Sequence, residues 1–352
     1  MKPIGRWLGR PFFVVGWCFF GLFITQCSSH QVTPAFYYWK TTFELSDKER
    51  DYLERLQVKR LYIRYFDVDW NPHQKKAVPV KEIQWKTKRL PTLQIIPTVF
   101  ITNRTLFNIS YNQLEKLGNN IAIKIQKKSK ALSEKVQINE VQLDCDWSGK
   151  TRKRFFKLIE ILKTKLKSNG IARISATIRL HQIKYFKKTG VPPVDKGMLM
   201  FYNMGNLDGS NTKNSILDLE IARRYLVKPG KYPLQLDVAL PIYRWGVVVR
   251  RGRVIELLNN LKNDTFANRS FFRLKGKNEI EVIQSTYIGS FYAYKGDVIR
   301  LEQVTTRQLK ESARMLRRFI KNNAMDVAFF HLDEKTLSNY QYENIQEIYH
   351  IF

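Results

Sequence analysis

Two aspartates separated by one residue form the part of this sequence that is best suited to acid–base chemistry. Asp144 and Asp146 close a short stretch in which Val141, Leu143 and Cys145 alternate with polar residues. In a β-strand such aspartates point to the same side, with Cα atoms about 6.5–7 Å apart, so their titrations can couple. One carboxyl can then keep its proton while the other stays ionised, as hydrolysis of a glycosidic bond requires.

We assign the role of general acid to Asp146, because it lies nearer the end of the predicted strand, where barrel active sites are built. Asp144 or Asp237 would then act as the base or as an electrostatic stabiliser. Arg179, His181 and Tyr202 are expected to hold substrate hydroxyl groups.

Strand parity places further polar side chains beside this pair. Side chains alternate along a strand, so in a barrel one set faces the axis and the other meets the helices. On the last predicted strand we expect His331 and Asp333 to face the axis and Phe330 to face outward. The full axis-facing set is Arg64, Asp144, Asp146, Arg179, His181, Tyr202, Asp237, His331 and Asp333. Because buried charges are costly unless paired or used, this set is either a structural Arg–Asp network or a pocket for a polyhydroxylated substrate.

Aromatic residues favour the pocket. Trp147, Tyr243 and Trp245 are expected to follow strand ends, where flat rings can stack on the apolar faces of sugars. Rings at such positions can also be packed lids.

The elements that must position these residues alternate between strand-like and helix-like segments. Eight strands are predicted at 58–66, 92–101, 140–146, 172–181, 198–203, 234–240, 297–303 and 326–332. Strands that alternate with helices favour parallel βαβ units, and eight of them fit a TIM-like (β/α)₈ barrel over residues 46–352. Residues 243–294 are expected to form an insertion between strands six and seven, or a second small domain.

The N-terminus resembles an export signal. In residues 1–26, three basic residues precede an apolar run at 11–24, which is shorter than the roughly 20 residues that span a membrane. Cys27 follows, as in a bacterial lipobox, so we expect lipidation there and a tether at 27–45. The alternatives are an uncleaved anchor and a buried helix. The expected location is the bacterial cell envelope, in a membrane leaflet that the sequence does not define.

The composition restricts the partners. With 60 Lys and Arg against 31 Asp and Glu, the net charge is +29. Such an excess attracts anionic glycans, anionic lipids or nucleic acid, or is a solvated surface. Because no nucleic-acid-binding motif is visible, we expect a carbohydrate partner, which the charge allows to be anionic, and not nucleic acid. No cofactor motif occurs, and the His and Asp residues lack compact metal-site spacing, so neither cofactor nor metal is predicted.

The segment Asp144-Cys145-Asp146-Trp147 resembles the strand motif of the chitinase-type glycosidase barrels, in which Asp-x-Asp-x-Glu ends a strand and the Glu is the acid catalyst. Ser148 stands at the position of that Glu, so the acid of the family is not carried over.

More broadly, residues 141–152 and the segment around Asp237, Tyr243 and Trp245 resemble an uncharacterised family of bacterial lipoproteins with glycoside-hydrolase-like barrels. This resemblance implies a fold and a location. Two hypotheses therefore stand: a membrane-anchored, glycosidase-like hydrolase that uses paired inward carboxylates, and a non-catalytic glycan-binding or envelope-structural lipoprotein on the same fold.

Overall fold

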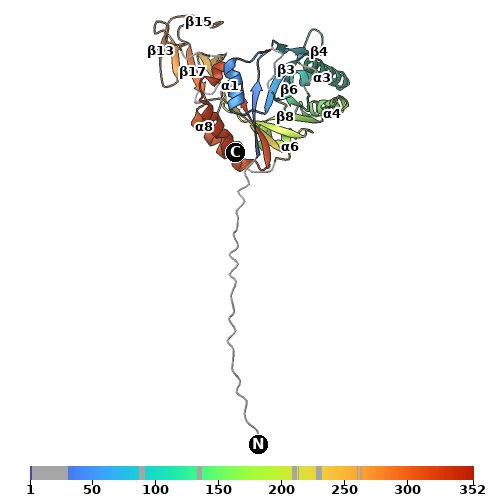
Figure 1. Cartoon of the computed structure of the whole chain (residues 1–352). Coiled ribbons are helices and arrows are strands. Elements are labelled where there is room, and N and C mark those ends of the chain that lie inside the picture. Colours follow the sequence, from blue (N-terminus) through green and yellow to red (C-terminus); the bar gives the residue numbers. More distant parts are fainter. Residues whose placement is uncertain are drawn as a thin grey trace.

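A closed barrel of eight parallel strands forms the body of the protein (Figure 1). The computed structural model describes residues 1, 31–86, 92–132, 137–207, 212, 214–226, 232–259, 261 and 264–352. Around the barrel the strands are β1 (Gln31–Tyr38), β3 (Arg60–Asn71), β6 (Gln94–Ile101), β7 (Glu140–Asp144), β8 (Arg173–Arg179), β9 (Lys196–Met200), β10 (Leu236–Pro241) and β18 (Ala324–Phe330). The predicted TIM-like fold is confirmed.

Strand β1 closes the barrel. It pairs in parallel with β18, Gln31 opposite Ala324, and with β3, Tyr38 opposite Ile63. The tether expected at 27–45 therefore contains a barrel strand within its described part. Its aromatic residues explain this, because Phe36 packs outward on Phe329 while Tyr37 stacks inside the barrel on Tyr62.

Helices cover the outside of the barrel. They are α1 (Asp47–Arg55), α2 (Asn103–Asn108), α3 (Tyr111–Leu132), α4 (Arg152–Ser168), α5 (Leu180–Lys184), α6 (Phe186–Thr189), α7 (Leu219–Tyr225), α8 (Thr306–Phe319), α9 (Glu334–Leu337) and α10 (Tyr342–Ile351). Each long helix buries an apolar stripe, as Phe155, Leu158, Ile159 and Leu162 do on α4. Strand β3 continues past the barrel into a hairpin with β4 (Lys76–Val80), and β2 (Thr42–Phe43) pairs with β5 (Gln84–Trp85).

The insertion is a separate antiparallel sheet between β10 and α8, beside the barrel (Figure 1). Its strands are β12 (Arg253–Asn259), β11 (Arg244–Arg250), β17 (Val298–Gln303), β14 (Glu279–Val282) and β13 (Phe272–Leu274), in that order. A hairpin of β15 (Thr286–Ile288) and β16 (Phe291–Ala293) extends from it. The segment predicted as the seventh barrel strand, 297–303, is β17 of this sheet. The insertion has its own hydrophobic core around Val248, Phe272, Val282 and Ile299.

The export signal and Cys27 lie outside the described residues, so their predicted roles stay predictions. Cys145 is buried with a free thiol. Over the part of the chain that the structure describes, no helix combines the length and apolar character that a membrane span needs.

Candidate functional site

A cleft of about 710 Å³ opens at the carboxyl ends of the barrel strands, between the barrel and the insertion. Eight of the predicted site residues line it. These are Arg64, Asp144, Asp146, Arg179, Tyr202, Tyr243, Trp245 and His331, which directly follows β18. The alternation of side chains on strands β3, β7 and β8 therefore correctly predicted that residues far apart in the sequence lie together.

Arg179 joins the two central carboxylates. Its Nε donates to Asp146, and its Nη2 lies 3.4 Å from Oδ1 of Asp144, which also accepts a 2.6 Å hydrogen bond from Oγ1 of Thr177. Asp144 is buried, whereas half of the Asp146 side chain is exposed. Burial raises the pKa of Asp144, and the charge of Asp146 adds to this while Arg179 opposes it. The surroundings of Asp144 thus favour its protonated form more than water does.

Aromatic rings form one wall of the cleft. Tyr202, Tyr243 and Phe330 contact one another with centroids 5.2–5.9 Å apart, and Trp245 extends the cluster from the insertion, 5.4 Å from Tyr243. Trp39, which follows β1, adds a ring 5.6 Å from Phe330. Burial raises the pKa of the Tyr202 hydroxyl above its ordinary value, so this wall stays neutral.

A second ion pair, between Arg64 and Asp67, lines the cleft beside Trp39. Arg64 donates to both carboxylate oxygens of Asp67, and its guanidinium lies 5.3 Å from the Trp39 ring. Sequence parity missed Asp67, because the pairing register between β3 and β6 shifts between Arg64 and Phe66. Such a bulge turns two consecutive residues outward and restores the following residue to the inner face.

Four predicted residues do not line the cleft, namely Trp147, His181, Asp333 and Asp237, of which Asp237 is described below. Trp147 is fully buried, stacks on Phe155 of α4 and donates to the Thr189 carbonyl oxygen. His181 is exposed, because helix α5 begins at Leu180 and ends the strand alternation. Asp333 caps α9 by accepting from the backbone N–H groups of residues 335 and 336. Trp147 therefore belongs to helix packing and Asp333 to helix capping, while His181 lies on the surface.

The side chains of β18 face the opposite way from the prediction. Phe330 faces the barrel interior, since its ring contacts Tyr37 and Tyr202, whereas Phe329 faces Tyr349 of α10. His331 reaches the cleft only because it follows the last residue of the strand. Burial lowers its pKa to about 4, so the imidazole is neutral at neutral pH.

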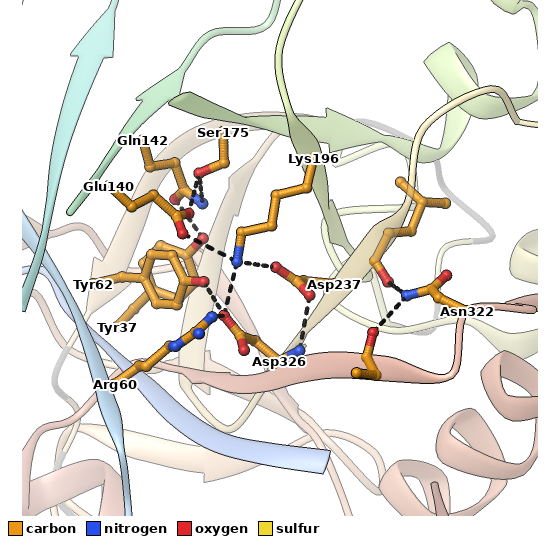
Figure 2. Close-up of polar contacts among 12 residues, drawn as sticks. Tyr37, Arg60, Tyr62, Glu140, Gln142, Ser175, Lys196, Asp237, Asn322 and Asp326 are labelled. Atoms are coloured by element: carbon orange, nitrogen blue, oxygen red, sulfur yellow. Dashed lines mark hydrogen bonds and ion pairs between the residues drawn. The ribbon is translucent and has the colours of Figure 1, made fainter. Parts of the chain in front are cut away.

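Asp237 faces the barrel axis as predicted, but it lies near the amino ends of the strands and not at the cleft. There the Nζ atom of Lys196 lies 2.7 Å from Asp237, 3.0 Å from Asp326 and 3.2 Å from Glu140 (Figure 2). Arg60 and Tyr62 also donate to Asp326. The structural alternative, an ion network filling the barrel, thus applies to this lower layer.

Replacing Asp237 by Asn is expected to change how stability depends on pH. Burial and the neighbouring Asp326 raise the pKa of Asp237 from 3.8 to about 6. Because the folded state then binds this proton more tightly than the unfolded state, its contribution to stability is complete below about pH 4 and is lost as the pH rises through about 6. Urea unfolding at about pH 4 and at about pH 7 should show that wild type loses more stability than the variant between these two pH values. An equal pH dependence in both proteins would contradict this assignment.

Metal ligands do not gather at the cleft. Across the described ranges, no group of three His, Cys, Asp or Glu side chains is arranged to hold a metal ion. The carboxylates that line the cleft are each paired with an arginine.

Comparison with known proteins gives the fold. No protein-family model matches the sequence, and no curated protein does. Among solved structures, a chitinase from Chromobacterium violaceum is similar with a TM-score of 0.50 and 11% identity, over 91% of this chain and 99% of that one. The spore cortex-lytic enzyme SleL of Bacillus megaterium gives a TM-score of 0.53 at 10% identity, over 92% and 75%. The SleL of Bacillus cereus gives 0.50 at 12%, over 89% and 75%. The chain thus shares its (β/α)₈ barrel fold with this chitinase and these spore cortex-lytic enzymes.

Proposed function

We propose that this protein binds an oligo- or polysaccharide in the cleft at the barrel mouth. The observation that carries the proposal is the wall of rings formed by Trp39, Tyr202, Tyr243, Trp245 and Phe330, set directly beside the ion pairs of the cleft. Rings bind the apolar faces of sugars, while carboxylates and guanidinium groups hold hydroxyls.

The charge of the cleft favours an anionic glycan. Its lining includes six basic side chains, namely Lys40, Arg64, Lys81, Arg179, Arg244 and Lys335, against the three carboxylates Asp67, Asp144 and Asp146, and Lys40 also pairs with Glu49 and Asp333 outside the lining. An excess of positive charge within a cleft attracts negatively charged ligands. Uronic acids and other acidic sugars are therefore the expected components of the ligand.

Replacing Trp245 by Ala should lower glycan affinity by about thirtyfold, as truncation of a central aromatic anchor typically costs 2 kcal/mol or more. Binding can be measured by calorimetry on N-acetylglucosamine oligosaccharides and on acidic oligosaccharides. Tyr287→Ala is the matched control, since that ring is 69% exposed on the β15–β16 hairpin and does not line the cleft. Equal losses in both variants, or no binding to any sugar by wild type, would overturn the proposal.

Hydrolysis is a second candidate function, favoured by one observation. Burial raises the pKa of Asp144, which favours this carboxyl as the proton donor, and the exposed carboxylate of Asp146 beside it could stabilise positive charge. This exchanges the roles predicted from the sequence, where Asp146 was the acid. One observation speaks against hydrolysis. Ser148, which stands where the chitinase-type motif has its catalytic Glu, does not line the cleft, and its backbone N–H donates to Thr151 at the start of α4.

We also propose that the chain is anchored to a membrane through lipid on Cys27. Cys27→Ala should release the protein from the membrane fraction or leave an unprocessed precursor, because the apolar run at 11–24 is short for a stable span. Fractionation followed by mass measurement of the N-terminal peptide reads both outcomes. A shortened N-terminus with unchanged membrane association would contradict the anchor.

A further inference from the structure

The face opposite the cleft is where the N-terminal segment joins the barrel. We call it the amino face, because the eight barrel strands begin there. Gln31 is the first residue of β1, is exposed, and donates its N–H to the Asn323 carbonyl oxygen at 2.7 Å. Cys27 precedes Gln31 by four residues. Since an extended chain of four residues reaches about 13–14 Å, a lipid on Cys27 would hold this face close to the membrane.

Exposed basic side chains gather on the amino face. Lys59 directly precedes β3, Arg173 begins β8, and Lys321 lies in the loop before β18. Lys167 and Arg318 lie in the last turns of α4 and α8. All five are exposed, and within the described residues none of them forms an ion pair.

Helix electrostatics accounts for only part of this cluster. Cations in the last turn of a helix interact favourably with its carbonyl end, which explains Lys167 and Arg318. Lys59, Arg173 and Lys321 lie outside helices and have no such partner. On the same face, the carboxylate of Asp195 is already occupied by Lys163 and by the backbone N–H of Ile174. Glu54, exposed in the last turn of α1, is a further carboxylate on this face, but the five basic side chains outnumber it and leave positive charge for an external partner.

We propose that the amino face lies against an anionic lipid surface, with the cleft opening away from the membrane. The proposal rests on the anchoring proposed above, because the anchor supplies the proximity. Basic side chains beside a lipid anchor add electrostatic attraction to anionic lipids to the binding that the anchor provides. Each basic residue near an anionic leaflet adds about fivefold to membrane affinity. Lipid is favoured over a soluble polyanion because the face that carries the charge is also the face where the N-terminal segment joins.

Lysine reactivity on vesicles tests this contact in the full chain. Wild-type protein is reconstituted with neutral phosphatidylcholine vesicles or with vesicles that also contain phosphatidylglycerol, then acetylated briefly and analysed by mass spectrometry. Lys59, Lys167 and Lys321 should lose reactivity several-fold on the anionic vesicles only. Lys275 and Lys277, exposed on the insertion, should react equally on both and provide an internal control.

Charge reversal sharpens the test. In the double variant Lys59→Glu, Lys321→Glu, protection of Lys167 should disappear, since two contributions of about fivefold each are removed. The matched variant Lys275→Glu, Lys277→Glu should keep it. Equal reactivity on neutral and anionic vesicles would overturn the proposal, and so would protection by soluble heparin without protection by anionic vesicles. Flotation with neutral vesicles reads the anchor separately, so failure of the anchor is distinguishable from failure of the contact.

Discussion

Lys196→Met is expected to destabilise the folded protein by about 3–5 kcal/mol, the usual cost of removing one partner from a buried ion pair. The Nζ atom of Lys196 lies within 3.2 Å of carboxylate oxygens on Glu140, Asp237 and Asp326, and its side chain is 13% exposed. Without the ammonium group, these carboxylates repel one another inside the barrel, and Arg60 contacts only Asp326. Urea unfolding at neutral pH would measure the loss.

A surface lysine provides the control for this change. Lys157 forms an ion pair with Glu160 in which both side chains are more than half exposed, so Lys157→Met should cost no more than about 1 kcal/mol. Adding Asp237→Asn to Lys196→Met should restore part of the lost stability, because one of the unpaired charges is removed. A loss for Lys196→Met no larger than that for Lys157→Met would show that the network contributes little.

If the cleft hydrolyses glycans, Asp144→Asn should lower turnover by about 10²–10⁴-fold, the typical contribution of general acid catalysis. Asn keeps the shape of the side chain and can still accept the hydrogen bond from Thr177, but it cannot supply a proton. Affinity should change far less, since the aromatic wall remains. Turnover and affinity would be measured on one responsive oligosaccharide, with Asp146→Asn in parallel to separate the two carboxyls.

The pH profile tests the same assignment. A raised pKa at Asp144 predicts that activity falls as the pH rises through that pKa, because the acid then loses its proton. Turnover in Asp144→Asn close to that of wild type would refute the assignment. Absence of hydrolysis by wild type across a broad substrate panel would leave glycan binding as the function.

Alternation along strands predicted the site where the strands are regular. On β7 and β8, Asp144 and Arg179 were placed correctly because nothing interrupts the period of two. The prediction failed where the backbone departs from that period: at the β3 bulge before Asp67, and at the start of α5, which turns His181 outward. These departures depend on tertiary packing and leave no signal in composition.

The position of a residue along the barrel axis could not be predicted from the sequence either. Parity fixes whether Asp237 faces the axis, but its level depends on strand stagger, which only the closed barrel defines. Strand β1 was missed for a different reason. Its aromatic residues show no clean polar alternation, since both faces of a parallel barrel strand are buried. With this run counted as a barrel strand, eight strands are complete without residues 297–303, which then belong to the insertion.

The closure of the barrel by β1 also constrains biosynthesis. The hydroxyl of Tyr349 donates to the carbonyl oxygen of Ala35, a contact between residues 314 positions apart, and β18 lies nearly as far from β1. Strand β1 is therefore synthesised long before β18, one of its two neighbours in the barrel. Unpaired strand edges template association with other chains, and distant contacts slow folding. Until β18 has been synthesised, β1 lacks this neighbour, and a chaperone that keeps the emerging chain from associating with other chains has to cover that strand edge while the intervening strands and helices are made.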